Sequence, residues 1–260
     1  MNQFDDLRAE LEARGLTKLK NFVSPAAAVA AHDQILAIAK RQGVYTSKGW
    51  QRSQSRFNYP KPFRTALNAL NHSSGFPNLI SDDLMRMVRQ LVGEPVTALS
   101  PGQQILFSLP VTKPWVVPSD VWHVDVPRLG TLGSPGVQMF TFLDEVQPKG
   151  GGTLVVSGSH RLLNTSRVLR SKELKRLLTN EPYFRALFDA NRPPIEDLRD
   201  TVGSVDDIKL EVVELTGNVG DVYLMDLRVL HTLSPNTSDN ARMMLTCRLP
   251  RTAIAEACIA

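Results

Sequence analysis

The N-terminal third of the chain shows hydrophobic residues at helical spacing. Between Ser81, which can cap a helix, and Gly93, which can end one, apolar residues recur every three to four positions. Helices are predicted in the same way over residues 4–14 and 26–42, with a short strand over residues 16–23 between them. We therefore expect residues 1–95 to be mainly helical and to pack against a sheet formed by the rest of the chain.

From Ala98 onward the pattern changes to short apolar or alternating segments, which Pro and Gly residues separate. Side chains alternate between the two faces of a strand, so this pattern predicts strands. Seven strands are predicted, over residues 104–109, 121–126, 137–143, 153–156, 210–215, 221–225 and 243–248. Short strands with turn residues between them are typical of a β-sandwich or barrel, so we expect a mainly β core over residues 98–250.

Residues 162–208 interrupt the series of strands. Apolar residues at helical spacing after Ser171, and the segment Pro182–Phe188, predict helices there. We interpret this stretch as a helical insertion between strands, and we therefore expect residues 1–260 to form a single domain.

Composition narrows the class of protein. Hydrophobic residues make up 42% of the chain, enough for a sizeable core, which excludes a disordered protein. The chain contains no run of about 18 apolar residues, which is the length needed to span a bilayer. Residues Met1–Glu10 are polar and acidic, unlike a secretory signal. Two cysteines, Cys247 and Cys258, are too few for a disulfide framework or a thiolate zinc site. We expect a cytoplasmic protein that does not span a membrane.

The formal net charge is +4, and most basic residues are interleaved with acidic ones. The segment 48–64 is an exception, because it contains no acid and five basic residues: Lys48, Arg52, Arg56, Lys61 and Arg64. Nucleic-acid recognition would need a longer basic surface or a known module, so we expect no nucleic-acid partner. Two interpretations of the segment stay open: a loop whose charges face solvent, or a surface that binds an anionic small molecule.

The motif Trp122-His123-Val124-Asp125 contains the first candidate metal ligands. Residues two apart on a strand face the same side, so a strand over residues 121–126 would direct His123 and Asp125 together. An imidazole beside a carboxylate supplies two ligands of the 2-His-1-carboxylate site of non-haem iron enzymes. The motif alone is weak, because a His-x-acid triplet often occurs by chance in a chain of this length.

A third candidate ligand, His231, follows the predicted strand 221–225. A metal site of this kind needs a ligand that the fold returns from a distant strand, and a barrel can do so. A histidine after a strand can equally be a structural residue with hydrogen-bonded nitrogens, so His231 by itself leaves both alternatives open.

Arg242 begins the next predicted strand, shortly after His231. An antiparallel strand would return this arginine to the candidate metal site. 2-Oxoglutarate chelates such a metal through its keto-acid end, and a guanidinium can bind its far carboxylate with two parallel hydrogen bonds. The alternative, a surface arginine on an edge strand, is less consistent with the apolar run Met243–Cys247 that follows.

Together these motifs resemble those of the phytanoyl-CoA dioxygenase family of iron(II)- and 2-oxoglutarate-dependent oxygenases. Trp122–Asp125 is similar to the family's His-x-Asp motif, and His231 and Arg242 are similar to its distal histidine and its co-substrate arginine. The opening segment 15–25 is also similar, so the resemblance covers most of the chain.

A further part of the resemblance is a strand–turn–strand unit. Residues 137–143, the turn Gly150–Gly152 and the segment Thr153–Arg161 resemble the family's unit ending in Pro-Gly-Ser-His. Ser157 stands where the family usually has proline, and the three glycines suggest a looser turn than usual. His160 lies in this motif but is not a metal ligand in the family, so we expect a structural role for it.

The resemblance implies a jelly-roll core, the double-stranded β-helix also found in cupins, with flanking helices. It implies that His123, Asp125 and His231 hold Fe(II), that 2-oxoglutarate and O2 are consumed, and that Arg242 binds 2-oxoglutarate. Gln104 is a candidate for the co-substrate pocket, with Gln103 as the alternative if the strand register differs, and Phe140 is a candidate wall. The last three could equally be core or edge residues.

The implied activity is oxidation of an unactivated C–H bond of a small metabolite, with hydroxylation as the default and succinate and CO2 as co-products. Related halogenases lack the carboxylate ligand, so Asp125 argues against halogenation. We expect a polar or anionic substrate that contacts Arg52, Arg56 and Arg128. Two rival functions stay open: a jelly-roll protein that binds a small molecule without turnover, and a cupin-like enzyme that uses Mn(II) or Zn(II) without 2-oxoglutarate. The sequence does not predict the oligomeric state.

Overall fold

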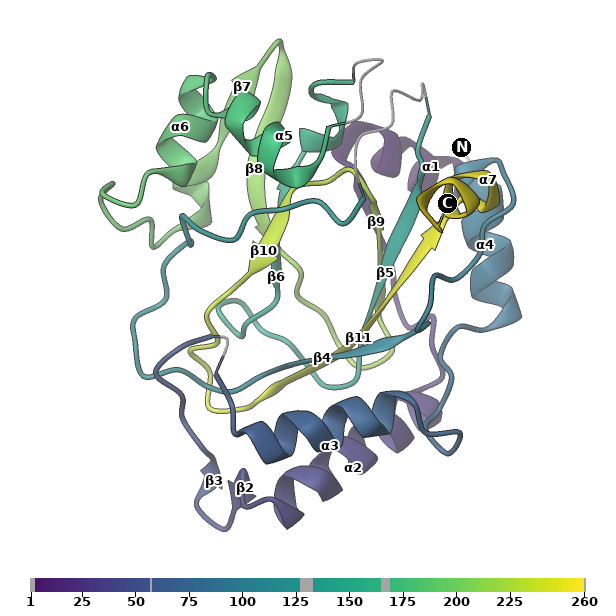
Figure 1. Cartoon of the computed structure of the whole chain (residues 1–260), viewed down its shortest axis with the longest axis vertical. Helices are drawn as coiled ribbons and strands as arrows, with labels where there is room; N and C mark the ends of the chain where they lie inside the picture. Colours follow the sequence, from purple (N-terminus) through teal and green to yellow (C-terminus); the bar gives the residue numbers. More distant parts are fainter. Residues whose placement is uncertain (1–2, 57, 127–132, 165–168, 260) are drawn as a thin grey trace.

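The computed structural model describes residues 3–56, 58–126, 133–164 and 169–259. Two antiparallel sheets face each other, and helices lie outside them (Figure 1). The larger sheet has the order β1 (Leu16–Leu19), β9 (Val222–Asp226), β5 (Gly136–Phe142), β11 (Arg242–Pro250) and β4 (Gln104–Ser108). The smaller sheet has the order β10 (His231–Leu233), β6 (Thr153–Ser157), β8 (Ile208–Glu214) and β7 (Gly203–Val205). The predicted mainly β, jelly-roll core with flanking helices is confirmed.

The helices predicted in the N-terminal third are present as α1 (Gln3–Arg14), α2 (Pro25–Arg41) and α4 (Asp82–Val92). The caps of α4 explain its limits. The Ser81 hydroxyl accepts a hydrogen bond from the Leu84 amide at 3.2 Å, and Gly93 adopts the left-handed φ of +77° that ends the helix. Within the described residues, no helix is both long enough and apolar enough to cross a membrane.

Three elements of the N-terminal part differ from the sequence-based predictions. The basic segment 48–64 is not a continuous loop, because it contains β3 (Gly49–Trp50), which pairs with β2 (Tyr45–Thr46), and the start of α3 (Lys61–Asn71). Helix α3 was not predicted, although Phe63 and Leu67 are buried at helical spacing. The predicted strand 16–23 stops at Leu19, and Asn21 adopts a φ of 50° that turns the chain.

The region of the predicted insertion, residues 162–208, contains α5 (Ser171–Leu178), α6 (Pro182–Phe188) and the short 3₁₀ helix η2 (Leu198–Thr201). It also contains β7, which was not predicted and extends the smaller sheet by pairing with β8. The chain ends in α7 (Thr252–Ile259).

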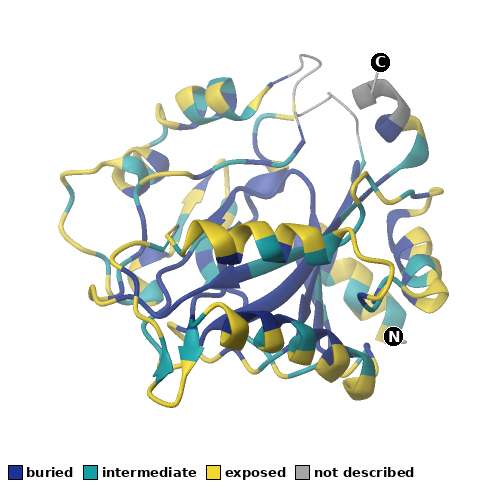
Figure 2. Ribbon diagram, turned by 60° about the horizontal axis from the view of Figure 1, so that its bottom comes forward, coloured by how far each residue is buried: buried dark blue, intermediate teal, exposed yellow. Residues whose placement is uncertain are grey.

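Apolar side chains form three clusters that follow the layers. One lies between the larger sheet and α2, α3 and α4, and a second lies between the smaller sheet and α5 and α6. The third lies between the two sheets and includes Phe140, Phe142, Val155, Leu215 and Met244. Figure 2 shows the central strands mostly in dark blue, with exposed residues on the outward faces of the helices.

Alternation along β11 decides which residues face the space between the sheets. Met243 and Leu245 pack in the cluster under the helices, whereas Met244 packs in the inner cluster. Side chains two apart share a face, so Arg242, Thr246 and Arg248 face inward with Met244. The pairing of β11 with β4 and β5 extends this inner face to Gln104, Leu106 and Ser108 on one neighbour and to Gln138, Phe140 and Phe142 on the other.

Candidate metal and co-substrate site

The three predicted metal ligands converge. One potential ligand atom from each of His123, Asp125 and His231 lies within 4.8 Å of the other two. The backbones of His123 and His231 form an isolated antiparallel bridge, with N–H···O distances of 3.0 Å and 2.9 Å in the two directions. Their ring centroids are 4.3 Å apart.

Both imidazoles are oriented by backbone carbonyls. His123 Nδ1 lies 2.9 Å from the Val121 carbonyl oxygen, and His231 Nδ1 lies 3.0 Å from the Val229 carbonyl oxygen. A carbonyl can only accept, so each Nδ1 carries the hydrogen and each Nε2 has a free lone pair. Burial lowers the pKa of His231 to about 4, although Asp125 acts in the opposite direction. His231 is therefore neutral near pH 7, as a metal ligand must be.

Asp125 presents one carboxylate oxygen to the histidines. Its Oδ1 accepts a hydrogen bond from Arg248 Nη2 at 2.9 Å, and its Oδ2 lies 3.6 Å from His231 Nε2. In the described part of the chain, Oδ2 is buried and has no hydrogen-bond partner. Burial by itself would raise the pKa of Asp125, but His231 and Arg248 outweigh that effect and leave the pKa lowered. Two imidazole nitrogens and one carboxylate oxygen fit a 2-His-1-carboxylate metal site.

The predicted strand over residues 121–126 is wrong, although its two candidate ligands do meet. Only His123 in this segment forms a ladder bridge, and Val121 has a φ of 59°, which interrupts an extended backbone. Tertiary contacts replace the ladder. The hydroxyl of Ser171, in α5, accepts from the Val124 amide at 3.3 Å and donates to the Val124 carbonyl at 2.8 Å.

Arg242 lies at the start of β11, opposite Ser108 of β4, on the inner face of the larger sheet. It is 3% exposed, and its Nε and Nη1 have no hydrogen-bond partner in the described ranges. Burial lowers its pKa to about 10, while Tyr59 and Glu214 act in the opposite direction. The Ser108 hydroxyl is also buried without a partner among the described residues. Buried donors without partners are costly, so this end of the site suits an anionic ligand.

The strand register separates the two glutamine alternatives. Gln104 has the inward parity of Leu106 and is paired with Thr246 of β11. Gln103 instead uses its amide outside the sheet: its Oε1 accepts from the Leu79 amide at 3.0 Å, and its Nε2 donates to the Pro77 carbonyl. Phe140 is 1% exposed and belongs to the inner cluster.

The three-glycine turn is tight rather than loose. A Cβ on Gly151, whose φ is +83°, would come within 2.7 Å of Asn236 Cβ and 2.9 Å of the Ser108 hydroxyl. Glu214 holds the turn by accepting from the amides of Lys149 at 2.7 Å and Gly152 at 3.0 Å. The turn therefore packs directly against the Ser108 and Arg242 end of the site.

The segment around His160, for which a structural role was expected, contacts the backbone beside the candidate ligand His231. The Ser159 hydroxyl accepts from the Leu230 amide at 2.9 Å, immediately before His231. His160 is buried, and its Nε2 lies 3.0 Å from the Glu12 carbonyl of α1, to which it must donate.

The candidate substrate arginines are held by acids. Arg52 pairs with Asp239 and also donates to the Val111 carbonyl at 3.3 Å, and Arg56 pairs with Asp120. An anionic ligand would therefore have to compete with Asp239 and Asp120. Arg128 lies outside the described residues.

Sequence reasoning missed three polar residues on the inner face: Gln138, Thr246 and Arg248. Thr246 donates to the Met139 carbonyl at 2.8 Å, so its oxygen accepts from Gln138 Nε2 at 3.0 Å, and the buried Gln138 Oε1 has no hydrogen-bond partner among the described residues. Thr246 and Arg248 lie an even number of residues after Arg242, so the alternation along β11 could have placed them on the same face as Arg242. Their hydrogen-bond partners could be identified only from the fold.

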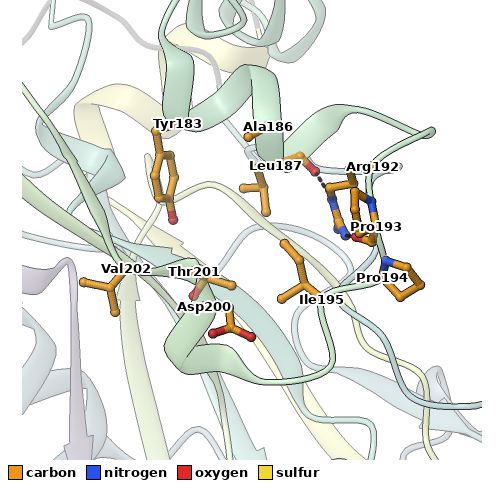
Figure 3. A pocket seen from close by; sticks show the side chains of 10 residues that line it. All are labelled: Tyr183, Ala186, Leu187, Arg192, Pro193, Pro194, Ile195, Asp200, Thr201 and Val202. Carbon is orange, nitrogen blue, oxygen red and sulfur yellow. Dashed lines mark hydrogen bonds between the residues drawn. The ribbon is translucent and has the colours of Figure 1, made fainter.

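A separate pocket of about 470 Å³ lies in the α5–α6 region. Figure 3 shows it between Tyr183, Leu187, Ile195 and Val202, with Arg192 at one side. Arg192 donates to the backbone carbonyls of Leu187, Pro193 and Val117. None of the candidate metal ligands lines this pocket, so we assign the chemistry to the inner face of the sheets instead.

A family model described as phytanoyl-CoA dioxygenase matches residues 11–244 of the chain. A search of curated protein sequences finds no match.

Several solved structures are similar in fold. The non-haem α-ketoglutarate-dependent carbocyclase SnoK from nogalamycin biosynthesis has 16% identity and a TM-score of 0.56, covering 96% of this chain and 84% of its own. The epimerase SnoN, in complex with Fe3+, α-ketoglutarate and nogalamycin RO, has 14% identity and a TM-score of 0.55, with coverage of 95% and 83%. HygX from Streptomyces hygroscopicus, with nickel and 2-oxoglutarate bound, has 14% identity and a TM-score of 0.52, with coverage of 97% and 88%.

Proposed function

Because the chain belongs to the phytanoyl-CoA dioxygenase family, we propose that it is an Fe(II)- and 2-oxoglutarate-dependent dioxygenase whose metal is held by His123, Asp125 and His231. One observation carries the proposal. One potential ligand atom from each of His123, Asp125 and His231 lies within 4.8 Å of the other two, and Asp125 Oδ2 is buried without a hydrogen-bond partner among the described residues. When bound, the metal would supply O2 activation coupled to conversion of 2-oxoglutarate to succinate and CO2, the chemistry that oxidises a C–H bond.

We assign the far carboxylate of 2-oxoglutarate to Arg242. Its unpartnered Nε and Nη1, and the neighbouring Ser108 hydroxyl, offer the donors that such a carboxylate needs. Gln104 shares this inner face, and Phe140 and Met244 provide apolar walls that exclude water from the co-substrate. HygX, which binds nickel and 2-oxoglutarate, and SnoN, which binds Fe3+ and α-ketoglutarate, support this choice of ligands.

We propose hydroxylation of an unactivated C–H bond of a small metabolite as the outcome. The similar carbocyclase and epimerase show that this fold supports other oxidative outcomes, so the assay must identify the product. Asp125 fills the protein carboxylate position and so argues against halide binding.

The substrate is proposed to be a small polar or anionic molecule. SnoN, which is seen with nogalamycin RO, supports a small-molecule substrate. Arg52 and Arg56 are the arginines to test, since an anion would have to displace Asp239 or Asp120 from them. Substrate affinity unchanged in the Arg52→Ala, Arg56→Ala double variant would contradict their role. We also propose a cytoplasmic location, consistent with the unpaired, buried thiol of Cys247.

The deciding experiment is 2-oxoglutarate turnover without added substrate. Protein reconstituted anaerobically with Fe(II) would receive 2-oxoglutarate and air, and succinate would be quantified for wild type, His123→Ala and Arg242→Ala. His72→Ala, which removes a histidine outside the cluster, is the matched control. We expect succinate from wild type and the control, none from His123→Ala and less from Arg242→Ala.

Two further outcomes identify the rival functions. Metal binding without a metal-to-2-oxoglutarate absorption band under anaerobic conditions would favour a cupin-like enzyme that uses another metal. Absence of both metal binding and succinate would favour a jelly-roll protein that binds a small molecule without turnover.

A further inference from the structure

Arg248 contacts the carboxylate of the metal triad directly. Its Nη2 donates to Asp125 Oδ1 at 2.9 Å, while Asp125 Oδ2, beside His231, has no hydrogen-bond partner in the described part of the chain. We propose that Arg248 is a positioning residue, which holds Asp125 by Oδ1 so that Oδ2 alone faces the metal. This inference rests on the metal site of the proposed function and adds a residue to it.

Asp125 needs an anchor because no strand fixes it. His123 is held by backbone bonds to His231, and Val124 is held on both sides by the Ser171 hydroxyl. Among the described residues, Asp125, the next residue along, has no backbone partner of this kind. An aspartate side chain rotates easily about its terminal torsion, so without a partner either oxygen, or both, could face the metal.

Arg248 is well placed to supply the anchor. It lies on β11 beside Gln138 of β5, and its carbonyl accepts from the Leu99 amide at 3.0 Å, so its backbone is fixed on both sides. The guanidinium is planar and donates along fixed directions, which restricts the carboxylate more than an ammonium would. The Asp125 side chain is only 7% exposed, so little water can compete for Oδ1.

The contact predicts the coordination mode. With Oδ1 engaged by Arg248, Asp125 would offer the metal a single oxygen, Oδ2. In the opposite role, Arg248 would compete with the metal for the Asp125 carboxylate and would be displaced when the metal binds. The two roles predict opposite effects on metal affinity. Charge repulsion between a guanidinium and a divalent cation also predicts tighter metal binding when Arg248 is removed. A loss of metal affinity in such a variant would therefore show that Arg248 acts by orienting Asp125.

The test is a calorimetric titration of the whole protein with Ni²⁺ in the absence of 2-oxoglutarate. For Arg248→Met we expect Ni²⁺ affinity to fall roughly 10- to 100-fold, the usual range for loss of a partner that orients a metal ligand. Arg89→Met is the matched control, because it removes an exposed arginine of α4 that belongs to neither the metal nor the co-substrate site. It should leave Ni²⁺ affinity unchanged.

Unchanged or tighter Ni²⁺ binding by Arg248→Met would overturn the inference while leaving the proposed function intact. Absence of Ni²⁺ binding by wild type would overturn both. Arg248→Lys covers the case in which Arg248→Met does not fold, because it keeps the charge and one donor but not the planar fork. A Ni²⁺ affinity of Arg248→Lys that is weaker than that of wild type, but not by as much as predicted for Arg248→Met, would support the role of Arg248. A Ni²⁺ affinity of Arg248→Lys equal to that of wild type would contradict it.

Discussion

His123 and His231 exchange backbone hydrogen bonds in both directions, at 3.0 Å and 2.9 Å, although they belong to distant segments of the chain. Each ring is then aimed by a second carbonyl two residues before it, at Val121 and Val229. The two nitrogen ligands are therefore held in place by backbone contacts before a metal binds. The carboxylate is held by a side chain instead.

Asp125→Ala tests the candidate carboxylate ligand. Loss of a direct ligand should lower Ni²⁺ affinity by more than the roughly 100-fold upper value for an outer partner. Asp120→Ala is the matched control, because Asp120 lies in the same segment but pairs with Arg56 and is exposed. Calorimetry on both variants checks the prediction. Equal Ni²⁺ affinity in Asp125→Ala and Asp120→Ala would remove Asp125 from the metal site.

Arg242→Met should separate stability from co-substrate binding. Because the Arg242 Nε and Nη1 are buried without partners among the described residues, an apolar side chain should leave the ligand-free protein at least as stable as wild type. Added 2-oxoglutarate, with Ni²⁺ present, should raise the melting temperature of wild type but not of Arg242→Met. Thermal unfolding with and without 2-oxoglutarate measures both effects. Equal stabilisation of the two proteins by 2-oxoglutarate would contradict the assignment.

Gly151→Ala should damage the anion end of the site. Its new Cβ would meet Asn236 Cβ at 2.7 Å and the Ser108 hydroxyl at 2.9 Å, so we expect these contacts to cost about 1–3 kcal/mol of unfolding free energy in addition to backbone strain. Gly93→Ala is the control, since its φ of +77° is similarly left-handed but its Cβ would meet nothing within 4 Å. It should cost about 1 kcal/mol from backbone strain alone. Denaturant unfolding of both variants checks the difference, and equal losses would rule out the packing explanation.

Glu214 should make stability depend on pH. Burial raises its pKa to about 7, even though the amides of Lys149 and Gly152 donate to it. An unfolded glutamate has a pKa of about 4.3, so between about pH 4 and pH 7 the folded protein binds more protons at this site. The Glu214 contribution to stability should therefore fall as pH rises through this window. Unfolding free energies measured across it should show that Glu214→Gln lacks this decrease, and identical slopes would contradict the prediction.

The chemical identity of the site could be predicted from sequence because it depends on local signals. The sequence alone shows these signals: the histidine and carboxylate of Trp122–Asp125, the later His231, and Arg242 before an apolar run. The helices and most strands were also predictable, because periods of 3.6 and 2 residues follow from burial of one face. Even α3 carried this signal in Phe63 and Leu67, but the surrounding basic residues favoured a loop.

The sequence by itself therefore predicted the types of candidate ligand and the two-residue alternation along most strands. Only the tertiary structure decided how the ligands are held. It replaced the expected strand at residues 121–126 with contacts to His231, Ser171 and Arg248, and it assigned Gln104 rather than Gln103 to the inner face. The reason is physical: alternation is a local property of the backbone, whereas register and side-chain partners depend on which distant segments the packed sheets bring together.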